Sequence, residues 1–311
     1  KTSFLLTCQE LTATNHMTIA RLFNEAMQIL WPSGVQFDNV LLFLTDAAAY
    51  MKKAAVGLAV SYPKMIHVTC VVHGLHRICE EIRALYPTVD KLISNGKKVF
   101  IKSPKRIEIF KNKNPNTPLP PTPVVTRWGT WLAAVQYYAE NMDGFVAVVK
   151  ELDKDDASSI QILQDILSDS VLKNDLAYMC FLCNSINKLE SVGLLLTEAV
   201  SVVEDVKKKL NALHGHAAQK IQKKLNDVFE KNYGFYIMCK LSNVLDGQYE
   251  ENVDVSVSDI PCYKYARLTS FDVERSFSKF KSVFRDNRQS FGMDNLRKHI
   301  VVYCNSSSSL N

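Results

Sequence analysis

The sequence lacks several features that mark whole classes of protein. No run of about 18 apolar residues is present, which is the length that a helix needs to cross a bilayer. The N-terminus shows no secretory signal pattern, and no segment of the chain repeats elsewhere in it. We therefore expect no membrane partner and no repeat architecture.

The sequence also lacks a disulfide pattern and a strong excess of charge. Its eight cysteines are scattered through apolar surroundings along 311 residues, whereas small disulfide-bonded domains space them closely. We therefore expect reduced thiols in an intracellular protein. The net charge of +5 is mildly basic, so it permits a nucleic-acid partner without indicating one. Hydrophobic residues make up 47% of the chain, which is enough for a globular core.

The first 95 residues alternate between strand and helix patterns. Residues 4–11, 40–44 and 65–72 each predict a strand, and the segments that follow repeat apolar residues at helical spacing. The run 40–44 is apolar at every position, which is typical of a parallel strand covered on both faces. We predict an α/β layer with parallel strands over residues 1–95.

The pattern changes after residue 95. Residues 96–125 are first basic and then proline-rich, which predicts a semi-rigid linker. Residues 126–245 show only helical patterns. Residues 246–311 begin with an acidic, loop-like stretch and continue with a clear helix.

Asp46 comes directly after the predicted buried strand that ends near residue 44. Ligands of open α/β sheets gather outside the carboxyl ends of the strands, so this acid is a candidate metal-binding carboxylate. It is equally a candidate helix N-cap, since Asp is a favoured capping residue. One acid does not make a site, because two-metal phosphoryl chemistry needs several carboxylates.

Cys70 and His73 have C-x2-H spacing at a predicted strand-to-helix junction. A closed zinc site needs four ligands at paired spacing, so we favour a buried thiol beside a hydrogen-bonded histidine. Cys180 and Cys183 have C-x2-C spacing inside an apolar helix, where a core thiol pair is the better interpretation.

Two segments are candidates for nucleic-acid contacts. Arg127 and Trp128 form a pair that can stack on an exposed base, although Trp128 and Trp131 can equally anchor a helix. A basic cluster precedes this pair and can bind phosphates, although such runs are more often simply solvated. The cluster contains Lys97, Lys98, Lys102, Lys105 and Arg106.

Four segments, in their order along the chain, resemble the hAT superfamily of DNA transposases. The resemblance is nearest to its domesticated relatives, which include the CGG-repeat-binding-protein-related group. The segments are LFLTDAAAYM, VTCVVHGLHRICEEIR, TRWGTW and LTSFDVERSFSKFKSVFRDNRQSF. The resemblance extends over nearly the whole chain. It implies a ribonuclease H-like sheet interrupted by a large all-helical insertion, with the last segment leading into a dimerisation-type region.

The resemblance also implies roles for individual residues. Asp46 matches the second catalytic aspartate and Glu274 matches the catalytic glutamate of an active site that holds two Mg²⁺ ions. From the residue alone, Glu274 is a solvated acid near a helix start, where the helix dipole favours it. Cys70 and His73 match a motif beside the active site.

The implied partner is DNA. Arg127 and Trp128 match residues near the cleaved DNA end, where the aromatic ring can stabilise a flipped base. The resemblance further implies a nuclear protein, which is able to self-associate and has no small-molecule substrate.

The family places its first catalytic aspartate upstream of the segment that residues 4–11 resemble, whereas this sequence begins at Lys1. We therefore expect a truncated sheet that lacks its first strands, and a fragment, a processed form or an incomplete gene model. Two carboxylates cannot hold two metal ions for in-line attack. One interpretation is a transposon-derived protein that keeps DNA binding or self-association. The alternatives are an active Mg²⁺-dependent transposase with a further N-terminal segment, and a decayed gene product.

Overall fold

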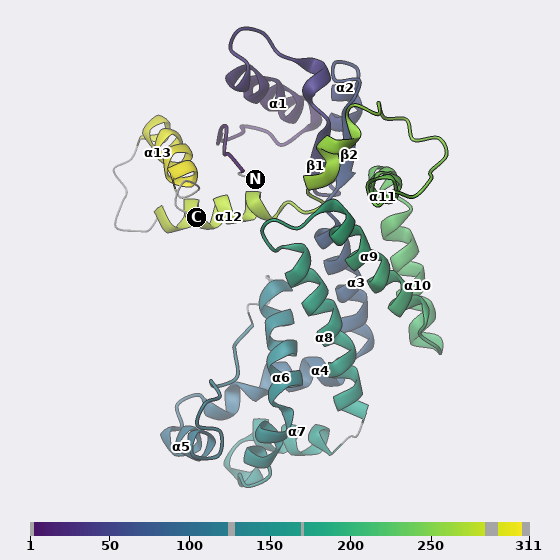
Figure 1. Ribbon diagram of the computed structural model, residues 1–311. Helices are drawn as coiled ribbons and strands as arrows, with labels where there is room; N and C mark the ends of the chain where they lie inside the picture. Colours follow the sequence, from purple (N-terminus) through teal and green to yellow (C-terminus); the bar gives the residue numbers. More distant parts are fainter. Residues whose placement is uncertain (1–2, 124–127, 169–170, 284–291, 307–311) are drawn as a thin grey trace. The chain divides into compact units, whose positions relative to one another are not determined.

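The protein is mostly helical, with one small two-stranded parallel sheet (Figure 1). The computed structural model describes residues 3–123, 128–168, 171–283 and 292–306. In these ranges no helix is both long and apolar enough to cross a membrane. The chain forms two compact units, which we call the strand unit and the helical unit. The strand unit contains Lys1–Gly74, Leu189–Glu204 and Asp227–Asn311, and the helical unit contains Leu75–Lys188 and Asp205–Asn226.

The strand unit holds the sheet and most of the N- and C-terminal helices. Its elements are α1 (His16–Leu30), η1 (Phe37–Asn39), β1 (Leu42–Thr45), α2 (Ala49–Ala59), β2 (Ile66–Thr69), α11 (Tyr233–Leu245), η4 (Ile260–Tyr265), α12 (Phe271–Val283) and α13 (Met293–Ser306). Strands β1 and β2 pair in parallel, with Leu42 opposite Ile66 and Thr45 opposite Thr69. The strand predictions at 40–44 and 65–72 are therefore confirmed, as is their parallel direction.

The strand predicted over residues 4–11 is wrong, because these residues have no strand partner in the described part of the chain. The backbone N–H of Leu5 donates to Asn305 Oδ1 at 2.9 Å, and Asn305 Nδ2 donates to the Leu5 carbonyl at 3.1 Å. A side-chain amide of α13 thus takes the place of a neighbouring strand. Leu5 and Cys8 pack against the apolar cluster of α13.

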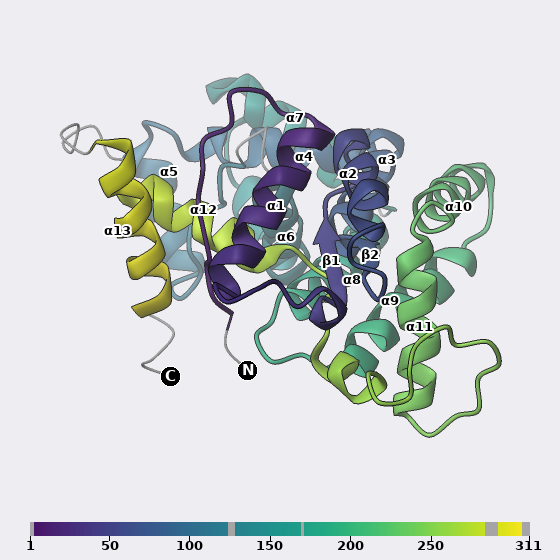
Figure 2. The same cartoon turned by 90° about the horizontal axis from the view of Figure 1, so that it is seen from above.

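Helices α1 and α2 pack together beside β1, and α11 contacts β2 on its other side (Figure 2). Asn15 caps α1 by accepting hydrogen bonds from the N–H groups of Met17 and Thr18. The Phe23 ring lies 4.9 Å from the Phe43 ring and 5.2 Å from the Tyr62 ring, both edge-on. These contacts join the first helix to β1 through one apolar cluster.

The start of α11 closes the outer edge of β2. The Thr69 N–H donates to Asn232 Oδ1 at 3.1 Å, and Asn232 Nδ2 donates to the Thr69 carbonyl at 2.8 Å. Both groups are buried, so an unsatisfied strand edge is avoided. A Cβ at Gly234 would lie 1.9 Å from the His67 carbonyl oxygen. Only glycine therefore allows this approach of helix to strand.

The described part of the helical unit contains no strand. Its elements are the main part of α3 (Val71–Leu85), α4 (Pro87–Gly96), η2 (Lys98–Phe100), α5 (Pro104–Lys113), α6 (Trp128–Val149), η3 (Lys154–Asp156), α7 (Ser158–Leu167) and α8 (Val171–Leu189). Helices α9 (Leu196–Asn211) and α10 (His216–Phe229) each have residues in both units. Helix α5 lies within the stretch that the sequence indicates as a linker, so this stretch is partly folded. Phe100 and Phe110 are buried there, with their rings 5.2 Å apart.

Gly234→Ala tests the approach of α11 to β2. We expect it to lower the free energy of unfolding by about 3 kcal/mol, since the added methyl group meets backbone and cannot be accommodated by a rotamer change. Chemical denaturation measures this. Gly57→Ala is the matched control, because nothing lies within 4 Å of its added Cβ in α2. The free energy of unfolding of this control should increase by roughly 0.5–1 kcal/mol, because alanine has a higher helix propensity than glycine. Equal stabilities of the two variants would contradict the described packing.

Candidate functional site

The candidate site lies at the carboxyl ends of the two parallel strands. Asp46 follows β1 and Cys70 follows β2, and the Cys70 N–H donates to the Thr45 carbonyl at 2.7 Å. The Asp46 carboxylate accepts a hydrogen bond from the Ala48 N–H at 3.0 Å. Asp46 thus stabilises the turn that leads into α2, and it lies at the edge where a ligand site would form. It is not the N-cap of α2, because that position is Ala48, which makes no side-chain cap hydrogen bond.

Cys70 and His73 form a hydrogen-bonded pair at the start of α3. Cys70 is buried, and its sulfur accepts a hydrogen bond from the Ser270 N–H at 3.3 Å. Burial alone would raise the pKa of the Cys70 thiol, but the hydrogen bonds from His73 and Ser270 outweigh it and lower that pKa below its usual value. The geometry agrees with the expected buried thiol beside a hydrogen-bonded histidine.

Glu274 reaches this pair from the first turn of α12. Its Oε1 lies 3.7 Å from His73 Nε2, and the Ser270 hydroxyl lies 3.4 Å from His73 Nδ1. The pKa of His73 is raised, first by the hydrogen bond to Cys70 and then by the negative charges of Cys70, Glu274 and Asp46. Burial opposes this shift. The pKa of His73 therefore depends on both of the predicted catalytic acids, Asp46 and Glu274.

Glu190 is a third acid beside this cluster, and it was not predicted from the sequence. Burial raises the pKa of its carboxyl group, and the charge of Glu274 raises it further, whereas Arg275 and His73 lower it. Glu190 follows helix α8, and nothing in its local sequence distinguishes it from other surface acids. Ser270 was missed as well, although it directly precedes the helix that carries Glu274.

The assembled residues do not fit a two-metal centre. Within the described ranges, no group of three or more His, Cys, Asp and Glu side chains is arranged to hold a metal ion. Mg²⁺ requires near-octahedral oxygen ligands. The predicted ligands are only Asp46 and Glu274, and Glu274 lies beside His73, which is hydrogen-bonded to Cys70.

The predicted nucleic-acid contacts fall in or next to the helical unit. Arg127 and the side chain of Trp128 lie outside the described residues. Trp131 is buried, and its indole Nε1 donates to Asp90 Oδ1 at 3.0 Å. Trp131 therefore anchors α6, as the alternative interpretation expects. The Arg83 guanidinium lies 5.4 Å from its ring.

The basic cluster divides into structural and exposed members. Arg106 donates to the Val99 carbonyl at 3.0 Å and lies 3.6 Å from the Asp156 carboxylate. Lys97 is half-buried. The exposed members, which form no ion pair in the described part of the chain, are Lys98, Lys102 and Lys105.

The pH dependence of His73 tests the site. Because its folded pKa is raised, protonation of His73 stabilises the fold below the ordinary pKa of about 6.5, and this contribution is lost as the pH rises through the raised value. NMR titration of the imidazole should give a pKa above that of a free histidine. Cys70→Ala should lower this pKa more than Glu274→Gln does, because the bond to Cys70 is the largest cause.

Cys262→Ala is the matched control for this titration, since Cys262 is an exposed thiol of the strand unit. It should leave the His73 pKa unchanged, and His73→Gln identifies the resonance by removing it. A His73 pKa that is equal in the wild type and in Cys70→Ala would contradict the described pair.

Comparison with known proteins gives a match to a family model. Residues 1–99 match a family model described as a domain of unknown function, DUF659. No curated protein matches the chain. The matched range includes Asp46, Cys70 and His73, and it ends before Glu274. The first 99 residues are therefore similar to DUF659, a domain found in hAT-family transposase-like proteins.

Proposed function

We propose that this chain is a transposon-derived protein of hAT type that binds DNA and does not cleave it by itself. The observation that carries the proposal is the return of Glu274 to His73. Residues from the DUF659 domain and from a distant helix meet at one sheet edge, in the arrangement that the hAT resemblance implies. The match over residues 1–99 supports the same origin independently.

The chemistry of the cluster supports loss of cleavage in this chain. Hydrolysis or transfer at phosphate needs metal ions held by several carboxylates to neutralise the developing charge. Asp46 is engaged in a turn, and Glu274 faces an imidazole. Without bound cations, the acids Asp46, Glu190 and Glu274 would repel a phosphodiester. The active, Mg²⁺-dependent transposase is the alternative that would need further carboxylates.

Binding to duplex DNA is assigned to the exposed lysines around α5. Lys98, Lys102 and Lys105 present three ammonium groups that no described acid neutralises. Lysines of this kind contact phosphates without reading sequence. Arg106 holds the η2–α5 segment in place through the Val99 carbonyl, so the lysines project from a folded surface.

Replacing Lys98, Lys102 and Lys105 together by Ala tests this assignment. Each phosphate contact on duplex DNA contributes about 0.9 to the magnitude of the slope of log K against log salt concentration. The magnitude of that slope should therefore be smaller by about 2 to 3 in the triple variant than in the wild type. Fluorescence anisotropy with a labelled duplex between about 50 and 200 mM salt measures it.

The control removes the same charge from another part of the helical unit. It replaces Lys208, Lys220 and Lys223 by Ala, which are exposed lysines on α9 and α10. The control should keep the wild-type slope. Equal slopes for the α5 variant and the wild type would remove the DNA assignment.

Exposed apolar residues on α12 favour self-association as a second function. Val273 and Phe277, which belong to the apolar stripe of this helix, are 57% and 58% exposed. Phe280 packs instead on the cluster of α13. Such neighbouring exposed apolar side chains mark interaction surfaces. In the hAT resemblance this segment leads into a dimerisation-type region, so a second copy of this chain is the proposed partner.

Val273→Glu should shift the protein toward monomer by at least about tenfold in dissociation constant, because it places a charge in the apolar contact. Analytical ultracentrifugation measures this. Val60→Glu is the matched control, since Val60 is 87% exposed at the end of α2. Self-association through α12 is ruled out if the two variants and the wild type sediment alike.

A further inference from the structure

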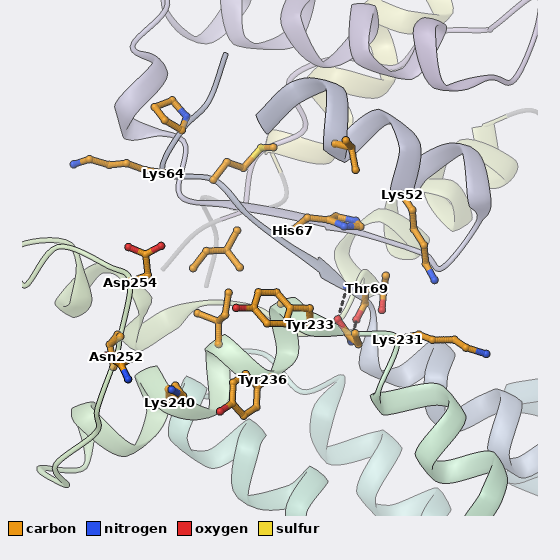
Figure 3. A pocket seen from close by; sticks show the side chains of 18 residues that line it. Lys52, Lys64, His67, Thr69, Lys231, Tyr233, Tyr236, Lys240, Asn252 and Asp254 are labelled. Carbon is orange, nitrogen blue, oxygen red and sulfur yellow. Dashed lines mark hydrogen bonds between the residues drawn. The ribbon is translucent and has the colours of Figure 1, made fainter. Parts of the chain in front are cut away.

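A pocket of about 480 Å³ lies along the outer edge of β2, within the strand unit (Figure 3). Its walls come from α2, β2, the start of α11 and residues 252–254. This volume is in the range of ligand-binding pockets. The pocket contains none of the residues of the candidate site, so it is a separate feature.

The pocket carries an excess of positive charge. Four lysines line it, against the single acid Asp254. Lys64 pairs with Asp259 at 2.9 Å, and Lys240 donates to the Glu251 carbonyl at 3.0 Å. The remaining lysines of the pocket are Lys52 and Lys231.

Lys52 and Lys231 form no ion pair with any residue in the described part of the chain. Figure 3 shows their side chains extending toward the same side of the pocket. The pKa of the neighbouring His67 is lowered, first by burial and then by the charge of Lys52. An anion bound between the two ammonium groups would meet an uncompensated positive field.

Two exposed tyrosines also line the pocket. Tyr233 is 73% exposed and Tyr236 is 55% exposed, and their ring centroids lie 6.2 Å apart with a tilt of 34°. The Lys240 ammonium lies 5.2 Å from the Tyr236 ring. Exposed aromatic rings next to cationic side chains are the combination that single-stranded nucleic acids use, with bases stacked on rings and phosphates at charges.

The two rings stand on a fixed support. They occupy the first turn of α11, which Asn232 joins to Thr69 by two hydrogen bonds. Gly234 brings the same turn against the His67 carbonyl. The tyrosines are therefore held beside the strand before any ligand arrives, which reduces the ordering cost of binding.

We propose that this pocket binds a single strand of nucleic acid, with phosphates at Lys52 and Lys231 and a base stacked on Tyr233 or Tyr236. A duplex does not fit this chemistry, because its bases already stack on each other and expose no face to the tyrosines. An acidic peptide would contact the lysines but would not stack on the tyrosine rings. The proposal concerns another surface than the duplex binding assigned to α5, and it stands on the pocket alone.

The test measures binding of labelled oligothymidine, oligouridine and a duplex of equal length to the whole chain, by fluorescence anisotropy. Tyr233→Ala should weaken oligothymidine binding by at least about fivefold. Tyr236→Ala is a second variant that removes the other ring of the same tyrosine pair. Lys52→Ala should reduce the salt slope by about 0.7, the value per phosphate contact on a single strand.

Each variant has a matched control that lies outside the pocket. Tyr249→Ala removes a ring that is 87% exposed. Lys53→Ala removes an exposed charge from the position next to Lys52 on α2. Both controls should bind oligothymidine as the wild type does. Tighter binding of either oligothymidine or oligouridine shows that the 2′-hydroxyl or the 5-methyl group affects binding, and equal binding shows that neither does; both results support the proposal.

The proposal is overturned if Tyr233→Ala weakens duplex binding as much as it weakens oligothymidine binding, or if both tyrosine variants bind oligothymidine as the wild type does. Competition by a polyglutamate peptide that depends on Lys52 but not on Tyr233 would assign the pocket to an acidic protein segment and overturn it too. The triple lysine variant of α5 is measured in parallel. If it loses duplex binding while the tyrosine variants change nothing, the single-strand site fails and the proposed function stands.

Discussion

The carboxyl end of β2 is the point on which the strand unit depends. On the outer edge, the Asn232 side chain forms hydrogen bonds with the N–H and the carbonyl of Thr69. On the inner edge, the Thr45 carbonyl accepts a hydrogen bond from the Cys70 N–H. The next residue, Val71, donates its N–H to the Leu268 carbonyl at 2.9 Å. Three successive residues thus bind three distant segments of the chain. Each bond joins buried groups, so its loss would leave donors or acceptors unsatisfied at a cost of about 1–3 kcal/mol.

This junction also explains how the candidate site comes together. The bond from Val71 to Leu268 fixes the residues just before α12, and Ser270 then reaches the Cys70 sulfur. One helical turn further along, Glu274 faces His73. The position of the glutamate is therefore a consequence of backbone bonding at the end of β2. The weak contact of 3.7 Å with His73 is not required to hold it there.

The sequence predicted the structure correctly where an element is determined by its own local residue pattern. The apolar run before Asp46 predicted β1. Residues 4–11 carry a similar strand pattern, but their backbone is bound by Asn305, a partner that no local pattern reveals. Glu190 escaped prediction for the same reason, since only the folded chain brings it to the other acids. The tyrosine pair beside β2 likewise depends on the close approach that Gly234 allows.

Strand β2 separates two electrostatic environments within one unit. At its carboxyl end lie the acids Asp46, Glu190 and Glu274, and along its outer edge lie Lys52 and Lys231. Phosphates are repelled by the first environment unless cations compensate it, and attracted by the second without any cofactor. The proposed nucleic-acid binding along the outer edge therefore does not depend on a metal site at the strand ends. A chain of this kind can lose phosphoryl chemistry and keep its affinity for nucleic acid, because the two properties rest on different residues.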